Sequence, residues 1–295
     1  MPSTDECPSV YCVLVNWNGW QDTVECLDSL RVQRYPHLKV VVVDNGSTNN
    51  SVTMIRKAHP WVSLVDTGAN LGFAGGCNVG IRLGLEHGAE YIWLLNNDTT
   101  VPDDTLGKLM HEARINPRAG AIGAVLYYMH DPGAIQAWGG GKINLWTGMV
   151  SHFTSPAQLN RNTYLTGACT LTPRHVYEEV GILYEGFFMY YDDCDLGLRL
   201  HKAGYEIVVA GDTAVLHKEG ASSQRRSPLI DRFITTSGLR LLKRHAPIPQ
   251  LSIALFILLR LANRIRRTDW KNAAAVWRGI AVYRKEQSLQ FSERA

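Results

Sequence analysis

The sequence lacks the features that mark secreted, membrane-spanning and disordered proteins. Its six cysteines are scattered without a C-x-x-C pair, which favours reduced thiols in a cytosolic protein over a disulfide framework. No run reaches the ~18–20 apolar residues that a membrane span needs, and residues 1–9 are polar and acidic, so we expect no secretory signal. With 45% hydrophobic and 19% charged residues among 295, the composition fits one large α/β domain or two small ones.

Charge is unevenly distributed along the chain. Residues 240–295 hold 12 Lys and Arg against 3 Asp and Glu, which leaves 18 against 24 for residues 1–239. The net charge of +3 therefore comes from the C-terminal region, which suggests an anionic partner there. A nucleic acid is disfavoured as that partner, because the C-terminal region is rich in apolar residues and the body is acidic.

The first half of the chain alternates strand and helix patterns. Four apolar, β-rich runs predict buried strands, at residues 10–15, 39–43, 61–65 and 91–95. Helical patterns fill the intervals, over residues 20–33, over a segment bounded by Pro60, and over residues 78–87. This alternation predicts an α/β fold with a doubly wound, mostly parallel sheet.

Polar side chains end three of these strands: Asn16, Asp44 and the pair Asn97 and Asp98. The carboxyl ends of parallel strands meet at one edge of a sheet, where ligands of α/β proteins bind. Asp98 is a hard oxygen donor suited to Mg²⁺ or Mn²⁺ on a diphosphate, and Asp44 can accept from a pyrimidine N–H or a ribose hydroxyl. Plain turns, one of them capping the helix that starts near Asp103, are the alternative.

Residues 68–80 are rich in glycine, which lets backbone N–H groups approach an anionic or sugar ligand closely. The segment follows the third predicted strand and has no G-x-G-x-x-G spacing. A dinucleotide-binding fingerprint is therefore a poor match.

The second half is less regular. Residues 103–115 predict a helix and residues 119–127 a strand, whereas glycine-rich residues 130–164 predict a hairpin or loop over the sheet edge.

A further strand is expected over residues 164–171, with Gly167 allowing close backbone approach. Thr172 and Pro173 are expected as the N-cap and first residue of a helix that Gly181 ends.

Three aspartates, Asp192, Asp193 and Asp195, open a helix that Gly204 ends. Carboxylates in a first turn cap free N–H groups and suit the helix dipole. One carboxylate is enough to cap the helix. Three carboxylates beside the aromatic side chains among residues 187–191 disfavour one another's ionisation. Such crowding gives a carboxylate a pKa useful for general-base work, and a solvated capping cluster is the alternative.

His217 closes a predicted strand and precedes a basic loop, rich in Gly and Ser, that contains Arg225 and Arg226. A lone histidine is usually structural. A histidine that serves as a second metal ligand beside a phosphate-binding loop would show the same sequence pattern, so both interpretations of His217 stay open.

Six motifs in this chain occur in a familiar order. They are Val15–Gly19, Val43–Thr48, Asn70–Asn78, Leu94–Asp98, Thr166–Ala168 and Tyr191–Asp195. Over about residues 10–220 the chain resembles family 2 glycosyltransferases of the GT-A fold, especially the rhamnosyltransferase-like branch. The resemblance implies a Rossmann-like, mostly parallel sheet. It also implies an inverting transfer of a sugar from a nucleoside-diphosphate sugar to an acceptor hydroxyl, with Mg²⁺ or Mn²⁺.

The resemblance also implies roles for individual residues. Asp98, at the end of the family's D-x-D motif, and His217 would bind the metal, and Asp193 would be the catalytic base. Asn96 stands where that motif begins with Asp, and Asp192 stands where the acidic motif usually has Glu. The acceptor would be contacted by Gly167, Tyr191, Asp192 and Asp195. The nucleotide-sugar would be bound by Asn16, Asp44, Asn70, Gly72, Asn78, Asn97, Arg225 and Arg226.

We expect a GT-A domain over residues 1–227, with a nucleotide-sugar half over about 1–128 and an acceptor half over about 129–227. The resemblance implies a cytoplasmic enzyme of cell-surface polysaccharide or glycolipid synthesis. It suggests rhamnose as the sugar and a glycan or lipid-linked glycan as the acceptor. A catalytically silent nucleotide-sugar-binding relative that acts as a scaffold is the alternative.

Residues 228–295 predict a basic, amphipathic helical region. Basic helices that carry Leu, Phe and Trp can lie in a membrane interface. We therefore expect residues 240–285 either to contact the inner face of the cell membrane peripherally, or to pack on the domain or on a second copy.

Overall fold

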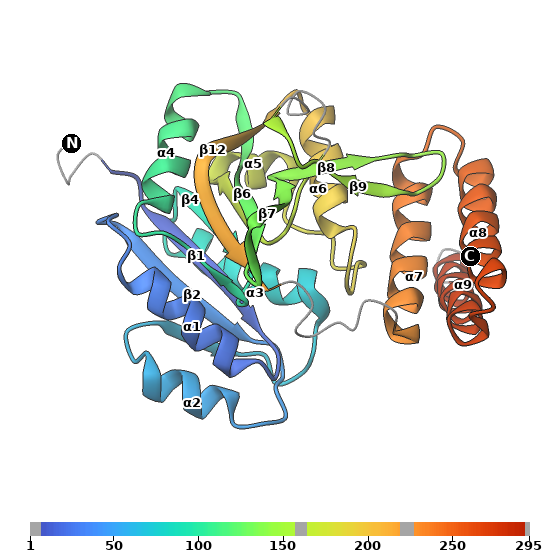
Figure 1. Cartoon of the computed structure of the whole chain (residues 1–295), viewed down its shortest axis with the longest axis horizontal. Coiled ribbons are helices and arrows are strands. Elements are labelled where there is room, and N and C mark those ends of the chain that lie inside the picture. Colours follow the sequence, from blue (N-terminus) through green and yellow to red (C-terminus); the bar gives the residue numbers. More distant parts are fainter. Residues whose placement is uncertain (1–6, 157–163, 219–226, 293–295) are drawn as a thin grey trace.

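The computed structural model describes residues 7–156, 164–218 and 227–292. A central sheet covered by helices on both faces forms the body, and three C-terminal helices stand together at one side of it (Figure 1).

The central sheet follows the predicted α/β pattern. Its strands are β1 (Val10–Asn16), β2 (Leu38–Asp44), β3 (Ser63–Asp66), β4 (Tyr91–Leu95), β5 (Thr99–Thr100), β6 (Ala119–Tyr128), β7 (Asp131–Trp138), β11 (Cys169–Pro173) and β12 (Glu206–His217). The order is β3-β2-β1-β4-β11-β6-β12-β5, with β7 paired to β6. The pairs β1–β2, β2–β3, β1–β4 and β6–β12 are parallel, whereas β11 is antiparallel to both of its neighbours. The sheet is therefore mixed but mostly parallel, as predicted.

Three helices cover each face of the sheet. One face carries α1 (Trp20–Arg31), α2 (Ser51–Ala58) and α4 (Thr105–Ile115), and the other carries α3 (Gly72–Glu86), α5 (Arg174–Val180) and α6 (Asp192–Lys202). Strand side chains alternate between the faces, so Cys12 and Leu14 pack under α1 whereas Tyr11 and Val13 pack under α3. Both layers are buried, which explains the uninterrupted apolar strand sequences.

The strand order places a topological switch at β1, because β2 lies on one side of it and β4 on the other. Open α/β sheets bind ligands in the crevice at such a switch, outside the carboxyl ends of the strands. The residues that follow β1, β2 and β4 are those that the sequence singled out as polar.

Two predicted boundaries were wrong. The helix predicted from residue 78 begins at Gly72. Its glycines let it lie tightly on the sheet, because a Cβ at Gly80 would be 2.2 Å from a Val13 methyl carbon. This close packing outweighs the poor helix propensity of glycine. Pro173 was predicted as the first helical residue, but it ends β11 and precedes α5.

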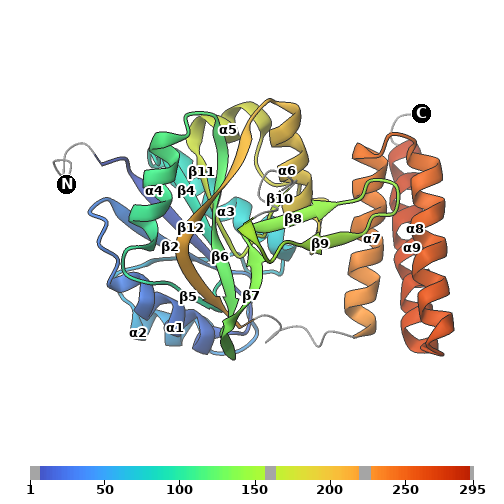
Figure 2. The ribbon, with the colours of Figure 1, turned by 45° about the horizontal axis from the view of Figure 1, so that its top comes forward.

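The segment predicted as a hairpin or loop contains β7 and part of a small second sheet, which also divides the strand predicted over residues 164–171. That sheet consists of β8 (Gly140–Ile143), β9 (Val150–His152) and β10 (Tyr164–Leu165). The β8–β9 hairpin extends from the body to the C-terminal helices (Figure 2). A Cβ at Gly148 would be 2.5 Å from the ring of Phe256, so the tip of the hairpin lies directly on these helices.

The C-terminal helices are α7 (Pro228–His245), α8 (Pro249–Arg266) and α9 (Trp270–Ser292). Their shared core contains Leu239, Leu242, Phe256, Val276 and Ile280. Leu241 of α7 also shares a buried cluster with Phe187 and Tyr191 of the body, so α7 packs on the domain. Among the described residues, no helix combines the length and the apolar character that crossing a bilayer requires.

Candidate functional site

A chain of buried polar side chains joins the three strand ends. Asn97 donates from Nδ2 to the Thr23 hydroxyl (2.8 Å), and Thr23 donates to Asn16 Oδ1 (2.9 Å). Asn16 in turn donates to Asp44 Oδ2 (2.6 Å). The sequence placed Asn16, Asp44 and Asn97 at one edge, and the structure brings them together through Thr23 of α1.

Asp44 is completely buried and organises the turn after β2. Its carboxylate accepts from the backbone N–H of Ser47 (2.9 Å) and from the Ser47 hydroxyl (2.8 Å), in addition to Asn16. The contact to a nucleobase or ribose predicted for Asp44 stays a prediction. In the structure its carboxylate shapes the loop that follows β2.

The start of α3 faces the same edge. Asn70 accepts at Oδ1 from the N–H of Gly72 (2.9 Å) and from Nδ2 of Asn45 (3.3 Å). Gly72 has φ +77°, and a Cβ there would be 2.4 Å from the Phe188 carbonyl oxygen, so no larger residue fits. The next N–H, of Phe73, donates to that carbonyl (2.7 Å), which ties α3 to the segment before α6.

Asn78 makes hydrogen bonds within the chain, and its predicted contact with the nucleotide-sugar stays a prediction. Its fully buried amide donates to the Leu183 carbonyl (2.8 Å) and to Glu185 (3.0 Å), and it accepts from the Leu183 N–H (3.1 Å). These bonds use the donors and an acceptor of the amide within the chain, so Asn78 holds the segment after α5.

The predicted metal ligands lie side by side at the end of β12. Asp98 Oδ1 is 3.1 Å from His217 Nε2, although 118 residues separate them along the chain. His217 Nδ1 is 2.8 Å from Gln136 Oε1 of β7, and Asn96 Nδ2 is 3.3 Å from Nε2. In this orientation of the Gln136 amide its oxygen accepts from Nδ1–H, and the neutral imidazole presents Nε2 to Asp98 and to the Asn96 amide.

This arrangement fits a divalent cation. Two acceptor atoms that face each other need a positive centre between them, and cis ligands at ~2.1 Å from an octahedral ion lie about 3.0 Å apart. Gln136 supplies the partner that a ligating histidine normally has on its other nitrogen. In the part of the chain that the structure describes, no three His, Cys, Asp or Glu side chains are placed together so that they could hold a metal ion. Water and substrate oxygens would therefore complete the coordination, as is usual for Mg²⁺.

The acidic motif opens α6 after an unusual backbone turn. Tyr190 and Tyr191 both have positive φ values, 69° and 68°, a conformation that side-chain-bearing residues adopt at an energetic cost. Burial, followed by the charge of Asp193, raises the pKa of Asp192 to about 8. Burial also raises the pKa of Asp193, but the N–H groups of Cys194 and Gly167 and the ring of His152 oppose that rise. These contacts stabilise the charged form of Asp193 against its burial.

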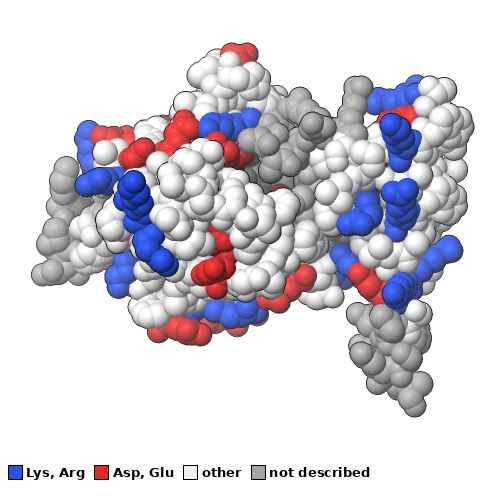
Figure 3. Space-filling model, turned by 90° about the horizontal axis from the view of Figure 1, so that it is seen from below, with Lys and Arg blue, Asp and Glu red and all other residues white. Residues whose placement is uncertain are grey.

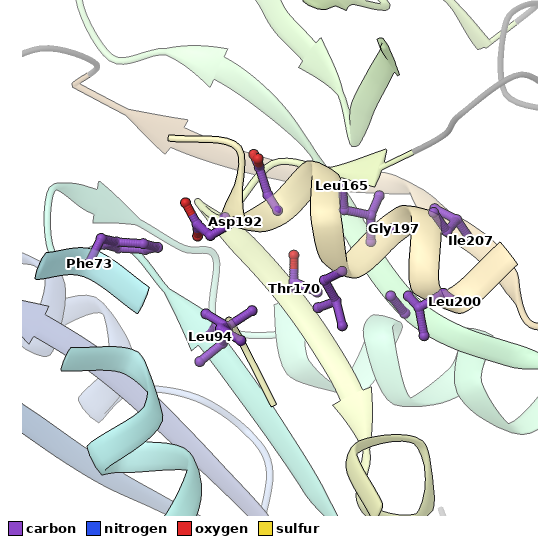
Figure 4. Close-up of a pocket in the computed structure, with 13 residues that line it drawn as sticks. Phe73, Leu94, Leu165, Thr170, Asp192, Gly197, Leu200 and Ile207 are labelled. Atoms are coloured by element: carbon purple, nitrogen blue, oxygen red, sulfur yellow. The ribbon is translucent and has the colours of Figure 1, made fainter. Parts of the chain in front are cut away.

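Asp193 lies beside the strand-end site. Gly167, whose N–H faces Asp193, precedes Ala168, and the Ala168 carbonyl accepts from the Asn96 N–H (3.0 Å). A cavity of about 20 Å³ borders Asp192, Asp193 and Gly167 (Figure 4). That volume holds about one water molecule. Figure 4 shows Asp192 and Phe73 at one end of this cavity and apolar side chains at the other.

Asp195 and Tyr191, two residues predicted to contact the acceptor, make contacts within the chain, and their acceptor contacts stay predictions. Asp195 is fully buried and pairs with Arg199 (2.8 Å), Arg244 (3.0 Å) and His245 (2.7 Å). Burial alone would raise its pKa, but the His245 hydrogen bond and the two arginines outweigh burial and lower it. The Tyr191 hydroxyl donates to the Gly148 carbonyl (2.9 Å) at the hairpin tip. Asp195 and Tyr191 therefore fasten α6 to the elements around it.

Arg225 and Arg226, predicted to bind the diphosphate, lie outside the described residues. The sequence did not single out Thr23, Ser47, Gln136 or His152. Thr23 and Gln136 sit within a helix and a strand, where nothing local distinguishes a network member from an ordinary polar residue.

The comparisons with known proteins agree with this geometry. Residues 11–181 match the glycosyl transferase family 2 model. N-acetylglucosaminyl-diphospho-decaprenol L-rhamnosyltransferase of Mycobacterium tuberculosis is 30% identical over 228 residues, which are 68% of this chain and 72% of the relative. The dTDP-rhamnosyl transferase RfbF of Shigella flexneri is 24% identical over 252 residues, 81% of this chain and 82% of the relative.

The fold comparison leads to the same conclusion. A mannosyltransferase of Pyrobaculum calidifontis, solved with GDP-Man and Mn²⁺, superposes with a TM-score of 0.60 at 20% identity, covering 99% of this chain and 83% of that one. It shares the GT-A fold. The family match over more than half of the chain, together with the rhamnosyltransferase relatives, shows that this chain belongs to glycosyl transferase family 2.

Proposed function

We propose that this glycosyltransferase moves L-rhamnose, with inversion, from a nucleoside-diphosphate sugar to a hydroxyl of a lipid-linked glycan, using Mg²⁺ or Mn²⁺. The observation that carries the proposal is the Asp98–His217 pair, two acceptor atoms 3.1 Å apart at the switch point of the sheet.

The donor would lie along the strand-end edge. The network from Asn97 to Asp44 fixes that edge in one geometry before the donor arrives, and such preorganisation reduces the cost of binding. A divalent ion held by Asp98 and His217 would stabilise the negative charge that develops on the departing diphosphate. Gln136 accepts the hydrogen bond of Nδ1, and a metal at Nε2 would replace the contact of that nitrogen with Asn96 Nδ2.

Asp193 would act on the acceptor. As the acceptor oxygen forms its bond to C1 of the sugar, its proton passes to the Asp193 carboxylate, and the bond between C1 and the diphosphate oxygen breaks. Attack opposite to the leaving group inverts the configuration at C1. Asp192, whose pKa of about 8 keeps it largely protonated at neutral pH, leaves Asp193 as the charged member of the pair.

Names of relatives support the choice of sugar and acceptor. Two relatives are named as rhamnosyltransferases, and one of these names specifies an N-acetylglucosaminyl-diphospho-decaprenol acceptor. A lipid-linked acceptor implies work at a membrane surface. We therefore propose peripheral contact with the inner face of the cell membrane and a role in cell-surface glycan synthesis.

Product analysis tests the proposal. The purified chain is incubated with dTDP-rhamnose, Mn²⁺ and a short-chain N-acetylglucosaminyl diphospholipid, and the anomeric configuration of the product is read by NMR. We expect one inverted rhamnosyl product with wild type and none with Asp193→Asn. Transfer from another nucleotide-sugar would correct the sugar, retention of configuration would overturn the mechanism, and donor binding without transfer would support the silent relative.

A further inference from the structure

The outer faces of α8 and α9 carry apolar residues that the bundle leaves uncovered. On α8, Leu251, Leu258 and Ile265 recur every seven residues, which places them on one side of the helix. On α9, Trp270 and Trp277 repeat the spacing and are 64% and 57% exposed. Phe256 on α8 and Val276 and Ile280 on α9 are buried in the core of the bundle. We call these five exposed residues the outer stripes.

Basic side chains flank the outer stripes. Arg266 follows Ile265, Lys271 follows Trp270 and Arg278 follows Trp277, and all three are exposed. Residues 249–288 contain eight Lys and Arg against two acids, and one of these acids, Glu286, pairs with Arg240 of α7. Figure 3 shows the basic side chains distributed over this bundle among uncharged residues.

We infer that the outer stripes are a docking surface for an anionic lipid bilayer, in which α8 and α9 lie along the membrane plane. Exposed tryptophans with flanking cations are the composition of helices that rest in a membrane interface. A second copy of the chain fits this face poorly, because both partners would bring the same cations together. An anionic leaflet offers negative charge to the flanking basic side chains and an apolar layer to the outer stripes.

The bundle is firmly attached to the acidic motif. Ser237 of α7 donates to the Met189 carbonyl (2.8 Å), and Arg244 and His245 hold Asp195. A membrane bound at the outer stripes would therefore stand in a fixed relation to Asp193. The inference extends the lipid-linked acceptor of the proposed function, but its test measures lipid binding and does not depend on the reaction.

Vesicle flotation of the full chain tests the inference. Wild type is mixed with phosphatidylcholine vesicles that contain 30% or no phosphatidylglycerol, a composition chosen as roughly that of an anionic leaflet. We expect binding to the anionic vesicles, weakened by salt, and little binding to the neutral ones. Absence of wild-type binding to anionic vesicles would overturn the inference.

Two pairs of variants locate the surface. One basic residue near an anionic leaflet contributes about fivefold in partitioning, so Arg266→Gln with Arg267→Gln should weaken binding about 25-fold. Trp270→Ser with Trp277→Ser should weaken it by about tenfold or more. The matched controls, Arg56→Gln with Lys57→Gln on α2 and Trp61→Ser, lie on exposed positions of the body and should bind as wild type does.

Two further measurements distinguish membrane docking from a failure of the proposed chemistry and from self-association. Donor-induced thermal stabilisation should be unchanged in the stripe variants, so a failure of the proposed chemistry is seen independently of lipid binding. Sedimentation velocity gives the oligomeric state. If the tryptophan variants convert a dimer to a monomer while vesicle binding persists, the face is an interface between copies and the inference is wrong.

Discussion

The first turn of α6 presents carboxylates to two different regions of the molecule. On the side of the sheet edge, Asp193 meets two backbone N–H groups and a histidine ring, and its pKa is raised by burial. On the side of the C-terminal bundle, Asp195 is fully buried between two arginines and a histidine, and its pKa is lowered. Two residues of the same type, two positions apart, thus have different chemistry.

The difference shows how neighbouring carboxylates in one motif can serve stability and chemistry separately. Asp195 is neutralised by Arg199, Arg244 and His245, so its charge contributes to folding and to holding α7 against α6. Asp193 is not neutralised in this way, so it keeps the basicity that proton transfer needs. Variants of these residues should therefore separate activity from stability.

The largest effect is expected from Asp193→Asn. Loss of the general base should lower kcat by about 10²- to 10⁴-fold, because the acceptor proton then has no positioned base. The thermal midpoint and the affinity for donor with Mn²⁺ should change little, since the amide keeps the shape of the side chain. Calorimetric titration with the nucleotide-sugar is the control, and a loss of donor affinity equal to the loss of kcat would contradict the role of base.

Asp195→Asn should act on stability. Removing this buried charge costs about 3–5 kcal/mol, because the largely covered side chains of Arg199 and His245 then lose their charged partner. The carboxylate has a lowered pKa in the folded state, so its contribution is present above the unfolded pKa and is lost as the pH falls through the folded value. Urea unfolding at pH 7 and pH 3 measures both effects. An equal deficit at the two pH values would show that the cluster is not held by this charge.

Gln136→Ala tests the proposed metal site at the sheet edge, the region that Asp193 borders. Gln136 contacts His217 Nδ1, and loss of such a partner typically lowers metal affinity 10- to 100-fold. Mn²⁺ binding followed by electron paramagnetic resonance gives this affinity without turnover. Gln136→Glu, which keeps an accepting oxygen, should retain tight binding. If both variants bind Mn²⁺ like wild type, His217 is not a ligand.

The last of these predictions concerns Asp192. Its folded pKa of about 8 lies above the unfolded value, so the folded state binds the extra proton and wild-type stability falls as the pH rises from about 4 to 8. In Asp192→Asn this decline should be shallower, and the variant should gain most relative to wild type at pH 8. Thermal midpoints between pH 5 and pH 8 measure it, and parallel pH profiles would contradict the assignment.

Much of the fold followed from local patterns in the sequence. The apolar strand runs and the polar residues at their ends predicted the parallel sheet and the meeting of Asn16, Asp44 and Asn97. Helix α3 was harder, because Gly72 to Gly80 lower helix propensity and the tight approach to Val13 that compensates is a tertiary contact. Asp98 and His217 came from the motif resemblance, and their 3.1 Å separation agrees with it.

The sequence could not assign different roles to residues of the same type. Asp193 and Asp195 look alike along the chain, and the partners that distinguish them, Arg244 and His245, are 49 and 50 residues further on. Asn78 belongs to a motif that suggests a ligand, yet its amide is used by Leu183 and Glu185. Such assignments depend on long-range contacts, which local spacing does not encode.

The measurement that tests the account most directly is thermal unfolding of three proteins, wild type, Asp98→Ala and Asp193→Asn, with a panel of nucleotide-sugars and either Mn²⁺ or EDTA. A donor at 100 times its Kd stabilises by about 2.7 kcal/mol, or roughly 4–5 °C for a chain of this size. We predict a Mn²⁺-dependent shift in wild type and Asp193→Asn that is lost in Asp98→Ala. A shift that survives EDTA, or that Asp98→Ala retains in full, would contradict the metal-held donor site.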